Sequence, residues 1–288
     1  MTITALRHLP EPPAQPDPSL RFKRRIHLGA SMRELFQSGE LTRSLAERDL
    51  KSRYKQAVLG VGWAVVTPLL LMVVSSVFFQ RVARVDTDPA PYALFSYLGT
   101  LPWSFFNSAL SNGGQSLVAN NTLLNKVYCP REVFPIAAVL VSAVDLAIAT
   151  GVLGVLFVLY GYGPTATAVW VPVLLAIQVA FTLGVVFIFS GVLVYVRDLR
   201  QALPMILQVG LFATPVFYGV DKFPQDLLTL YATVNPLVGV IDGYRRTVLY
   251  GQSPDWSLVG PGAATSLVIL IVGYLVLKRL ETRFADVA

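Results

Sequence analysis

Residues 133–160 read VFPIAAVLVSAVDLAIATGVLGVLFVLY, an apolar run with a single acid, Asp145, and no base. A helix needs about 20 apolar residues to cross the hydrocarbon core of a bilayer, so this run is long enough to span it. Five further runs are similar, of which 202–219 is the weakest because it contains Pro204 and Pro215. The predicted spans are 61–79, 92–111, 133–160, 169–196, 202–219 and 258–277. We therefore expect an all-α, polytopic membrane protein with six transmembrane helices.

The composition of the whole chain agrees with a membrane protein. Of the 288 residues, 54% are hydrophobic and only 14% are charged, whereas soluble domains carry about 25% charged residues. These figures argue against a soluble globular enzyme, a disordered chain and a coiled coil. The single cysteine, Cys129, excludes an internal disulfide and a cysteine-based metal cluster.

The basic residues predict the orientation. Six spans place both termini on one side of the membrane, and 18 of the 23 Lys and Arg residues fall on that side. The richer side is cytoplasmic by the positive-inside rule, so we expect both termini in the cytoplasm. The orientation therefore accounts for the net charge of +6, and we expect no nucleic-acid partner. The first 60 residues are polar and hold no signal peptide, so the first span is expected to direct insertion and to stay in the protein.

Two segments precede the first span. Residues 1–30 include the proline-rich stretch 10–18 and are expected to form an extended or disordered tail, with the transmembrane domain at 31–288. Residues 40–58 predict an amphipathic helix in the cytoplasmic interface, either a simple anchor or a gate beside the translocation path. Its apolar stripe is Leu41, Leu45, Leu50, Tyr54 and Val58, and its other face pairs Arg43 with Glu47, Glu47 with Lys51, and Asp49 with Arg53.

The cytoplasmic loop 112–132 contains signals for a short helix. Asn120 or Asn121 can cap a helix over 122–128, and Pro130 then ends it. A short helix between spans is a segment that a soluble motor protein can bind. An ordinary connector between two spans has the same sequence pattern.

The outward loop 220–257 predicts two further helices. They begin near Pro224 and Pro236, with Asn235 as an N-cap and Gly251 as the end of the second. This loop is too apolar to extend into water. Irregular backbone at membrane depth is tolerated only where protein or a water-filled cavity surrounds it. We therefore expect re-entrant helices that form an outward gate.

Catalytic patterns are missing from the spans. Both histidines, His8 and His27, precede the first span, and no G-x-x-x-x-G-K-[ST] loop is present, so the chain is not expected to hydrolyse ATP by itself. A membrane glycosyltransferase is disfavoured because its acidic cluster is absent. Asp145 has two open interpretations. It is the proton site of a secondary transporter, or a lone acid bonded to neighbouring hydroxyl groups, since no base lies in any span.

Motifs in the polar segments point to a family. They are RDLKSRYKQAVLGVGW at 48–63 with Pro68 after it, LGTLPWSFF at 98–106, KVYCPREVFP at 126–135, YVRDL at 195–199, TPVFY at 214–218, and Asn235-Pro-Leu with Tyr244-Arg-Arg. In this order they resemble the polysaccharide-export ABC permeases of the ABC-2 type, which export O-antigen, capsule and teichoic-acid polymers. The resemblance covers about 48–288.

The resemblance implies a machine with several subunits. It implies a homodimer with a channel between the protomers and two copies of a separate ATP-binding subunit, which binds the ATP and the Mg. The cargo is a glycan on polyprenyl pyrophosphate, and the location is the bacterial inner membrane. A permease for a drug or a small lipid is the alternative.

The resemblance also assigns roles to residues. Coupling to the ATPase is assigned to Asn121, Asn125, Lys126, Tyr128, Pro130, Arg131 and Glu132. A cytoplasmic gate for the lipid headgroup is assigned to Arg48, Lys51, Arg53, Tyr54, Lys55 and Trp63. For the four basic side chains among these, anchoring to membrane lipid fits as well. The outward gate and channel are assigned to Phe217, Tyr218, Tyr231 and Tyr244, and no residue to a metal.

Overall fold

The computed structural model describes residues 33–35, 37–55, 59–82, 87, 89–124, 129–163 and 165–281, and every regular element among these residues is a helix. The α-helices are α2 (Gly39–Tyr54), α3 (Trp63–Ser75), α4 (Tyr92–Ala119), α5 (Asn121–Leu124), α6 (Val133–Tyr160), α7 (Val171–Val192), α8 (Leu199–Ala213), α9 (Gln225–Val234), α10 (Pro236–Val248) and α11 (Trp256–Glu281). Short helices of other types are Gly60–Gly62, Ser76–Val82, Ala166–Trp170 and Val220–Lys222. The predicted all-α class is confirmed.

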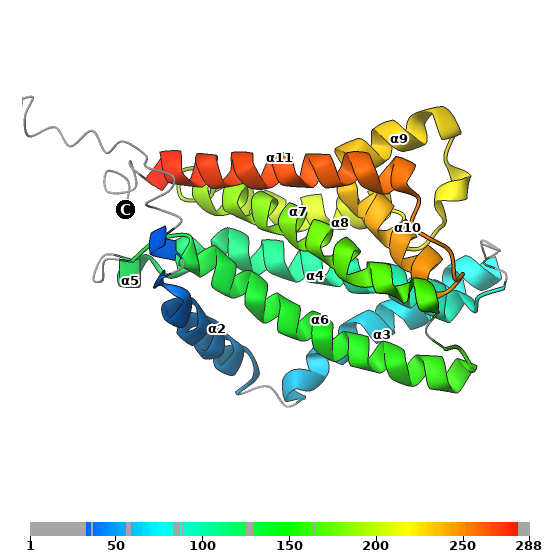
Figure 1. Ribbon diagram of the computed structural model, residues 1–288. Helices are drawn as coiled ribbons and strands as arrows, with labels where there is room; N and C mark the ends of the chain where they lie inside the picture. Colours follow the sequence, from blue (N-terminus) through cyan, green and yellow to red (C-terminus); the bar gives the residue numbers. More distant parts are fainter. Residues whose placement is uncertain are drawn as a thin grey trace, which may run out of the picture.

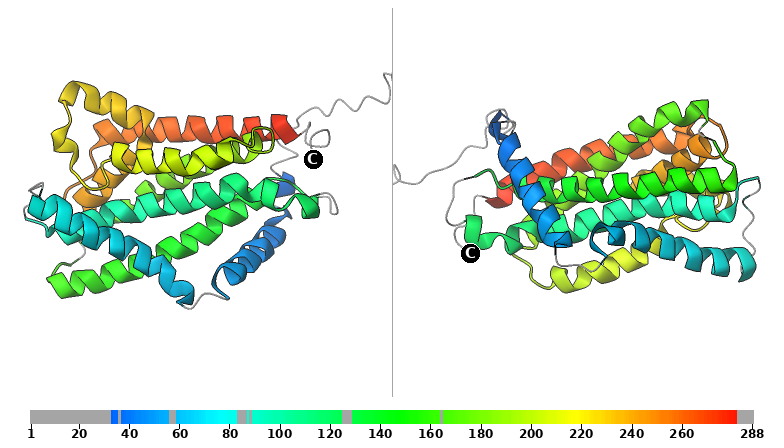
Figure 2. Two further views of the ribbon diagram at one scale, coloured as in Figure 1. Left: turned by 180° about the vertical axis from the view of Figure 1, so that it is seen from behind. Right: turned by 90° about the horizontal axis from the view of Figure 1, so that it is seen from below.

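The long helices form one bundle. Figure 1 shows α4, α6, α7 and α11 running along a common axis, and α4 packs against both α6 and α7. Helices α2 and α5 lie at the end of the bundle where α11 finishes, and α9 and α10 lie at the opposite end (Figures 1 and 2). Helix α2 and the C-terminal end of α11 thus lie at the same end of the bundle. This is the arrangement expected of a chain that crosses the membrane an even number of times.

Four helices are long and apolar enough to cross a membrane by length and composition. They cover Gly60–Phe79, Val133–Tyr160, Ala166–Val192 and Trp256–Glu281. They correspond to the predicted spans 61–79, 133–160, 169–196 and 258–277. The second predicted span, at 92–111, lies inside α4, which has 28 residues and continues through Ala119. Helix α4 carries more polar residues than these four, and its neighbours in the bundle bury most of it.

The predicted span 202–219 differs from the structure. Helix α8 covers Leu199–Ala213, only 15 residues, or about 22 Å at 1.5 Å per residue. It ends because Thr214 is extended, with φ −94° and ψ 142°, as expected for a residue directly before a proline, here Pro215. The hydrocarbon core is about 30 Å thick, so α8 alone is short for a full crossing.

Two glycines let α7 and α11 approach closely. A Cβ on Gly273 would lie 2.2 Å from the carbonyl oxygen of Gly184, and a Cβ on Gly184 would lie 2.6 Å from the backbone of Ile269. Small residues at such positions allow membrane helices to gain backbone contact that larger side chains prevent. This contact fixes α11 and, through it, the helices of the outward loop.

The outward loop contains the two predicted helices. Pro224 precedes α9, and Pro236 is the first residue of α10, where the Asn235 side chain accepts a hydrogen bond from the Leu237 N–H at 3.2 Å. Gly251 adopts a left-handed φ of 64° after the helix. One face of α10 points to the protein interior, with exposures from 0% to 8%, and consists of Leu237, Ile241, Tyr244 and Val248.

Candidate functional site

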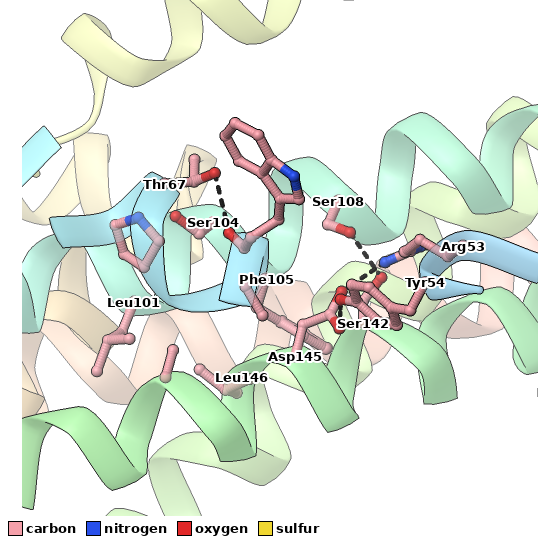
Figure 3. A pocket seen from close by; sticks show the side chains of 14 residues that line it. Arg53, Tyr54, Thr67, Leu101, Ser104, Phe105, Ser108, Ser142, Asp145 and Leu146 are labelled. Carbon is pink, nitrogen blue, oxygen red and sulfur yellow. Dashed lines mark hydrogen bonds and ion pairs between the residues drawn. The ribbon is translucent and has the colours of Figure 1, made fainter. Parts of the chain in front are cut away.

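Helix α2 is joined to the middle of α6 by an ion pair. The Arg53 guanidinium donates to Asp145 Oδ2 at 2.5 Å, and the Tyr54 hydroxyl donates to Asp145 Oδ1 at 2.5 Å (Figure 3). The predicted pairing of Asp49 with Arg53 is wrong, because Arg53 turns to Asp145 and Asp49 pairs with Arg48. The interpretation of Asp145 as an acid without a basic partner is also wrong. Its partner comes from α2, which packs against α6.

The Tyr54 phenol keeps its proton at physiological pH. Burial, followed by the hydrogen bond to Asp145, raises the pKa of Tyr54 to about 12. It therefore serves as a donor to the Asp145 carboxylate. The Arg53 side chain is 27% exposed and the Asp145 side chain 17%, so the pair is only partly shielded from solvent. We call the three residues the α2–α6 latch.

A largely apolar cavity of about 330 Å³ adjoins the latch, between α3, α4 and α6 (Figure 3). Trp63 and Pro68 contribute from α3, and Leu101 and Phe105 from α4. Trp63 is about half exposed and stands at the rim of this space. The hydroxyl groups of Ser108 and Ser142, 3.1 Å apart, make the wall near Asp145 polar.

A second cavity of about 420 Å³ lies beside the first, between α2, α4 and α6, and its wall is more polar than that of the first. Arg48 lines it and donates to Asn120 Oδ1 at 2.9 Å and to Asp49 at 2.8 Å. The polar wall is completed by Ser52, Asn112 and Ser116. Arg53 lines both cavities, so its guanidinium stands where the polar space meets the apolar one.

The predicted gate residues are therefore only partly brought together. Arg48, Arg53, Tyr54 and Trp63 surround the two cavities. Lys51 on α2 and Lys55 directly after it are exposed and line neither cavity. Asp145, Asn112 and Asn120 were not assigned to this site from the sequence. Asp145 stood out as an intramembrane acid, but nothing in the pattern indicated which helix meets it.

The predicted coupling residues lie between α4 and α6. Helix α5 has only four residues, and Asn121, its first residue, is exposed. Pro130 is buried, and Arg131 donates to the Glu281 carbonyl oxygen at 2.9 Å. Asn125, Lys126 and Tyr128 lie outside the described residues.

Glu132 is fully buried and pairs with Lys278 on α11, with 2.6 Å between Oε1 and Nζ. Lys278 also contacts Glu281 at 3.1 Å. This buried cluster ties the start of α6 to the end of α11. Sequence reasoning missed it, because 146 positions separate Glu132 from Lys278 and helical periodicity does not predict such distant partners.

A match to known proteins decides the family. Residues 40–249 match the model of the ABC-2 type transporter family. The chain belongs to this family. A Myxococcus xanthus relative named O-antigen export system permease protein RfbA is 30% identical over 256 residues, which are 88% of this chain and 98% of that protein. A Klebsiella pneumoniae protein of the same name is 30% identical over 244 residues, 84% of this chain and 93% of its own length.

As an ABC-2 type permease, the chain is a multi-pass membrane subunit without a catalytic ATPase domain. Among the described residues, the candidate site consists of the ion pair between Arg53 and Asp145 and the two cavities beside it. The partly exposed Arg53 is held by an internal carboxylate, and a guanidinium binds carboxylate and phosphate oxygens through the same kind of hydrogen bonds.

The predicted outward-gate residues of this permease fall into two groups. Phe217 and Tyr244 are buried inside the protomer: the Phe217 ring stacks on Phe79 at 5.5 Å, and the Tyr244 hydroxyl donates to Gln178 Oε1 at 2.9 Å. Their burial favours a packing role. The rings of Tyr218 and Tyr231 flank Phe223, at centroid distances of 5.8 and 5.0 Å.

Arg245, on α10, is a buried residue to which the sequence analysis assigned no role. It is 2% exposed and donates to the backbone carbonyl oxygens of Phe95, Pro215, Val216 and Tyr218. Its guanidinium also lies 3.6 Å from the centre of the Phe95 ring. Arg245 therefore positions the segment after α8 against α4 and α10. The Tyr244-Arg245-Arg246 motif was the signal that marked it.

Proposed function

We propose that this permease is the membrane-channel subunit of an ATP-driven exporter that moves a polysaccharide linked to polyprenyl pyrophosphate across the bacterial inner membrane. The observation that carries the proposal is similarity along almost the whole chain to permeases named for O-antigen export. Local likeness to a transport domain alone would not specify the cargo.

The two adjoining cavities support a lipid-linked cargo. A pyrophosphate headgroup requires several hydrogen-bond donors and positive charge, and Arg48, Arg53 and Asn112 offer these in the polar cavity. An isoprenoid chain requires apolar walls, which Trp63 and Pro68 help to form in the neighbouring cavity. In this proposal the headgroup displaces Asp145 from Arg53, and α2 then moves away from α6.

The proposal includes further parts. Two copies of this chain form the channel, and two ATP-binding subunits, which bind ATP and Mg, dock at the end that holds α2 and α5. This end is cytoplasmic, so both termini are cytoplasmic, and α3, α4, α6, α7, α8 and α11 make the six spans. Residues 121–132 transmit the motion, and Tyr218 and Tyr231 belong to the outward gate.

Deletion of the gene in its host tests the function. The expected result is loss of surface polysaccharide while lipid-linked glycan accumulates inside the cell, with both defects reversed by the wild-type gene. Surface polysaccharide that persists at the wild-type level contradicts the proposal. Deletion of the partner ATPase gene separates it from proton-coupled transport through Asp145, since that alternative predicts export without the ATPase.

A further inference from the structure

A third cavity, of about 440 Å³, lies between α4, α6, α7 and α10. None of the residues around it carries a formal charge. They are Leu98, Leu101, Pro102, Phe105, Ala143, Leu146, Ala147, Thr150, Leu153, Val171, Leu175, Gln178, Val179, Tyr244 and Val248. The headgroup residues of the proposed function are absent from this wall, so a different ligand has to be considered.

The polar side chains in this wall are already hydrogen-bonded to protein. Gln178 donates to the Pro102 carbonyl oxygen at 3.0 Å and accepts from the Tyr244 hydroxyl at 2.9 Å. Thr150 donates to the Leu146 carbonyl oxygen at 2.8 Å. A buried water needs two to four polar partners, so these walls favour hydrocarbon over water. An apolar cavity of about 150 Å³ already binds benzene, and this one is about three times as large.

The cavity opens between α6 and α7. The residues that α4 and α10 contribute are buried, including Phe105 and Tyr244, whereas Ala147 and Thr150 on α6 and Leu175 on α7 are exposed. Both of these helices are apolar enough to span the membrane. The mouth therefore lies on the exposed surface of two helices that are apolar enough to span the membrane.

We propose that one acyl chain of a membrane phospholipid occupies this cavity. Acyl chains are the bulk hydrocarbon at the mouth, so mass action favours them over a scarce isoprenoid. The chain fills a space that would otherwise leave its lining without contacts. It also supports the latch, because Leu101, Phe105 and Leu146 line both this cavity and the one beside Asp145.

Native mass spectrometry of the full permease, purified with its ATPase, tests the proposal. Ala147→Phe places a ring in the mouth, and Ala176→Phe is the matched control, because Ala176 is exposed on α7 and does not line the cavity. The wild type and Ala176→Phe are expected to retain one phospholipid per chain that Ala147→Phe loses. Equal retention by all three proteins overturns the site, and recovery of polyprenyl lipid in place of phospholipid overturns the occupant.

A second measurement covers the case in which Ala147→Phe does not fold. A cryo-electron microscopy map of the wild-type complex in phospholipid nanodiscs is expected to show one elongated density between α6 and α7, continuous with the bilayer. An empty cavity, or one filled by a side chain of a second protomer, contradicts the proposal. This readout does not depend on export activity, so it stands apart from the test of the proposed function.

Discussion

Substitution of the latch residues Arg53 and Asp145 by alanine, singly and together, measures how firmly α2 is held on α6. Breaking a fully buried ion pair costs about 3–5 kcal/mol, and exposed pairs contribute about 0.2–1 kcal/mol. This pair is 27% and 17% exposed, and Tyr54 adds a hydrogen bond. Residues in contact within one hydrogen-bond network show coupling free energies of about 0.5–3 kcal/mol in double-mutant cycles, so we expect about 1.5 kcal/mol for this partly exposed pair.

The assay is the free energy of unfolding of the four proteins in mixed detergent micelles, combined as a double-mutant cycle. Arg43 and Glu47 form the matched control pair on α2, because their side chains, 82% and 51% exposed, lie 3.0 Å apart. The control is expected to give about 0.3–0.5 kcal/mol. A latch coupling no larger than the control value refutes the view that this pair holds α2 in place.

Three further substitutions test other contacts by the same unfolding measurement. Lys278→Met leaves the buried Glu132 charge unpaired and is expected to cost about 3–5 kcal/mol, with a smaller loss when Glu132→Gln accompanies it; equal losses contradict the buried pair. Arg245→Lys is expected to lose about 3 kcal/mol or more, because one ammonium cannot serve four carbonyl groups, and a loss below about 1 kcal/mol argues against this. Gly273→Ala forces α11 away from Gly184 and is expected to cost about 1–3 kcal/mol, whereas Gly260→Ala, with open space around it, is expected to be nearly neutral.

The helices were predictable where local sequence decides them. Helix α6 begins and ends at the predicted residues, because Glu132 precedes its apolar run and Gly161, with a φ of 69°, stops it. The two outward helices were predictable because Pro224, Asn235 and Pro236 mark where each of them begins. The end of α8 was misjudged, because the uncharged run continues through Thr214, whereas the helix ends before it, at Ala213.

The site was only partly predictable, because its contacts join distant helices. Periodicity indicated which face of α2 is charged, but the spacing of four positions between Asp49 and Arg53 suggested a local ion pair. The actual partner, Asp145, is 92 positions away. Likewise, the family resemblance assigned Phe217 and Tyr244 to an outward gate, whereas the fold buries both. The sequence pattern indicates which face of a helix is charged or apolar, but tertiary packing decides which other helix contacts that face.

Binding of polyprenyl pyrophosphate to the purified permease–ATPase complex tests the central claim most directly. Arg53→Gln removes a charged donor, which is worth about 1.5–3 kcal/mol, so affinity is expected to fall about tenfold or more. Lys51→Gln, the control on the same helix outside both cavities, is expected to leave affinity unchanged. Asp145→Asn is expected to bind more tightly than the wild type, because the internal anion no longer competes for Arg53. Equal affinity in all four proteins contradicts a headgroup site at the α2–α6 latch.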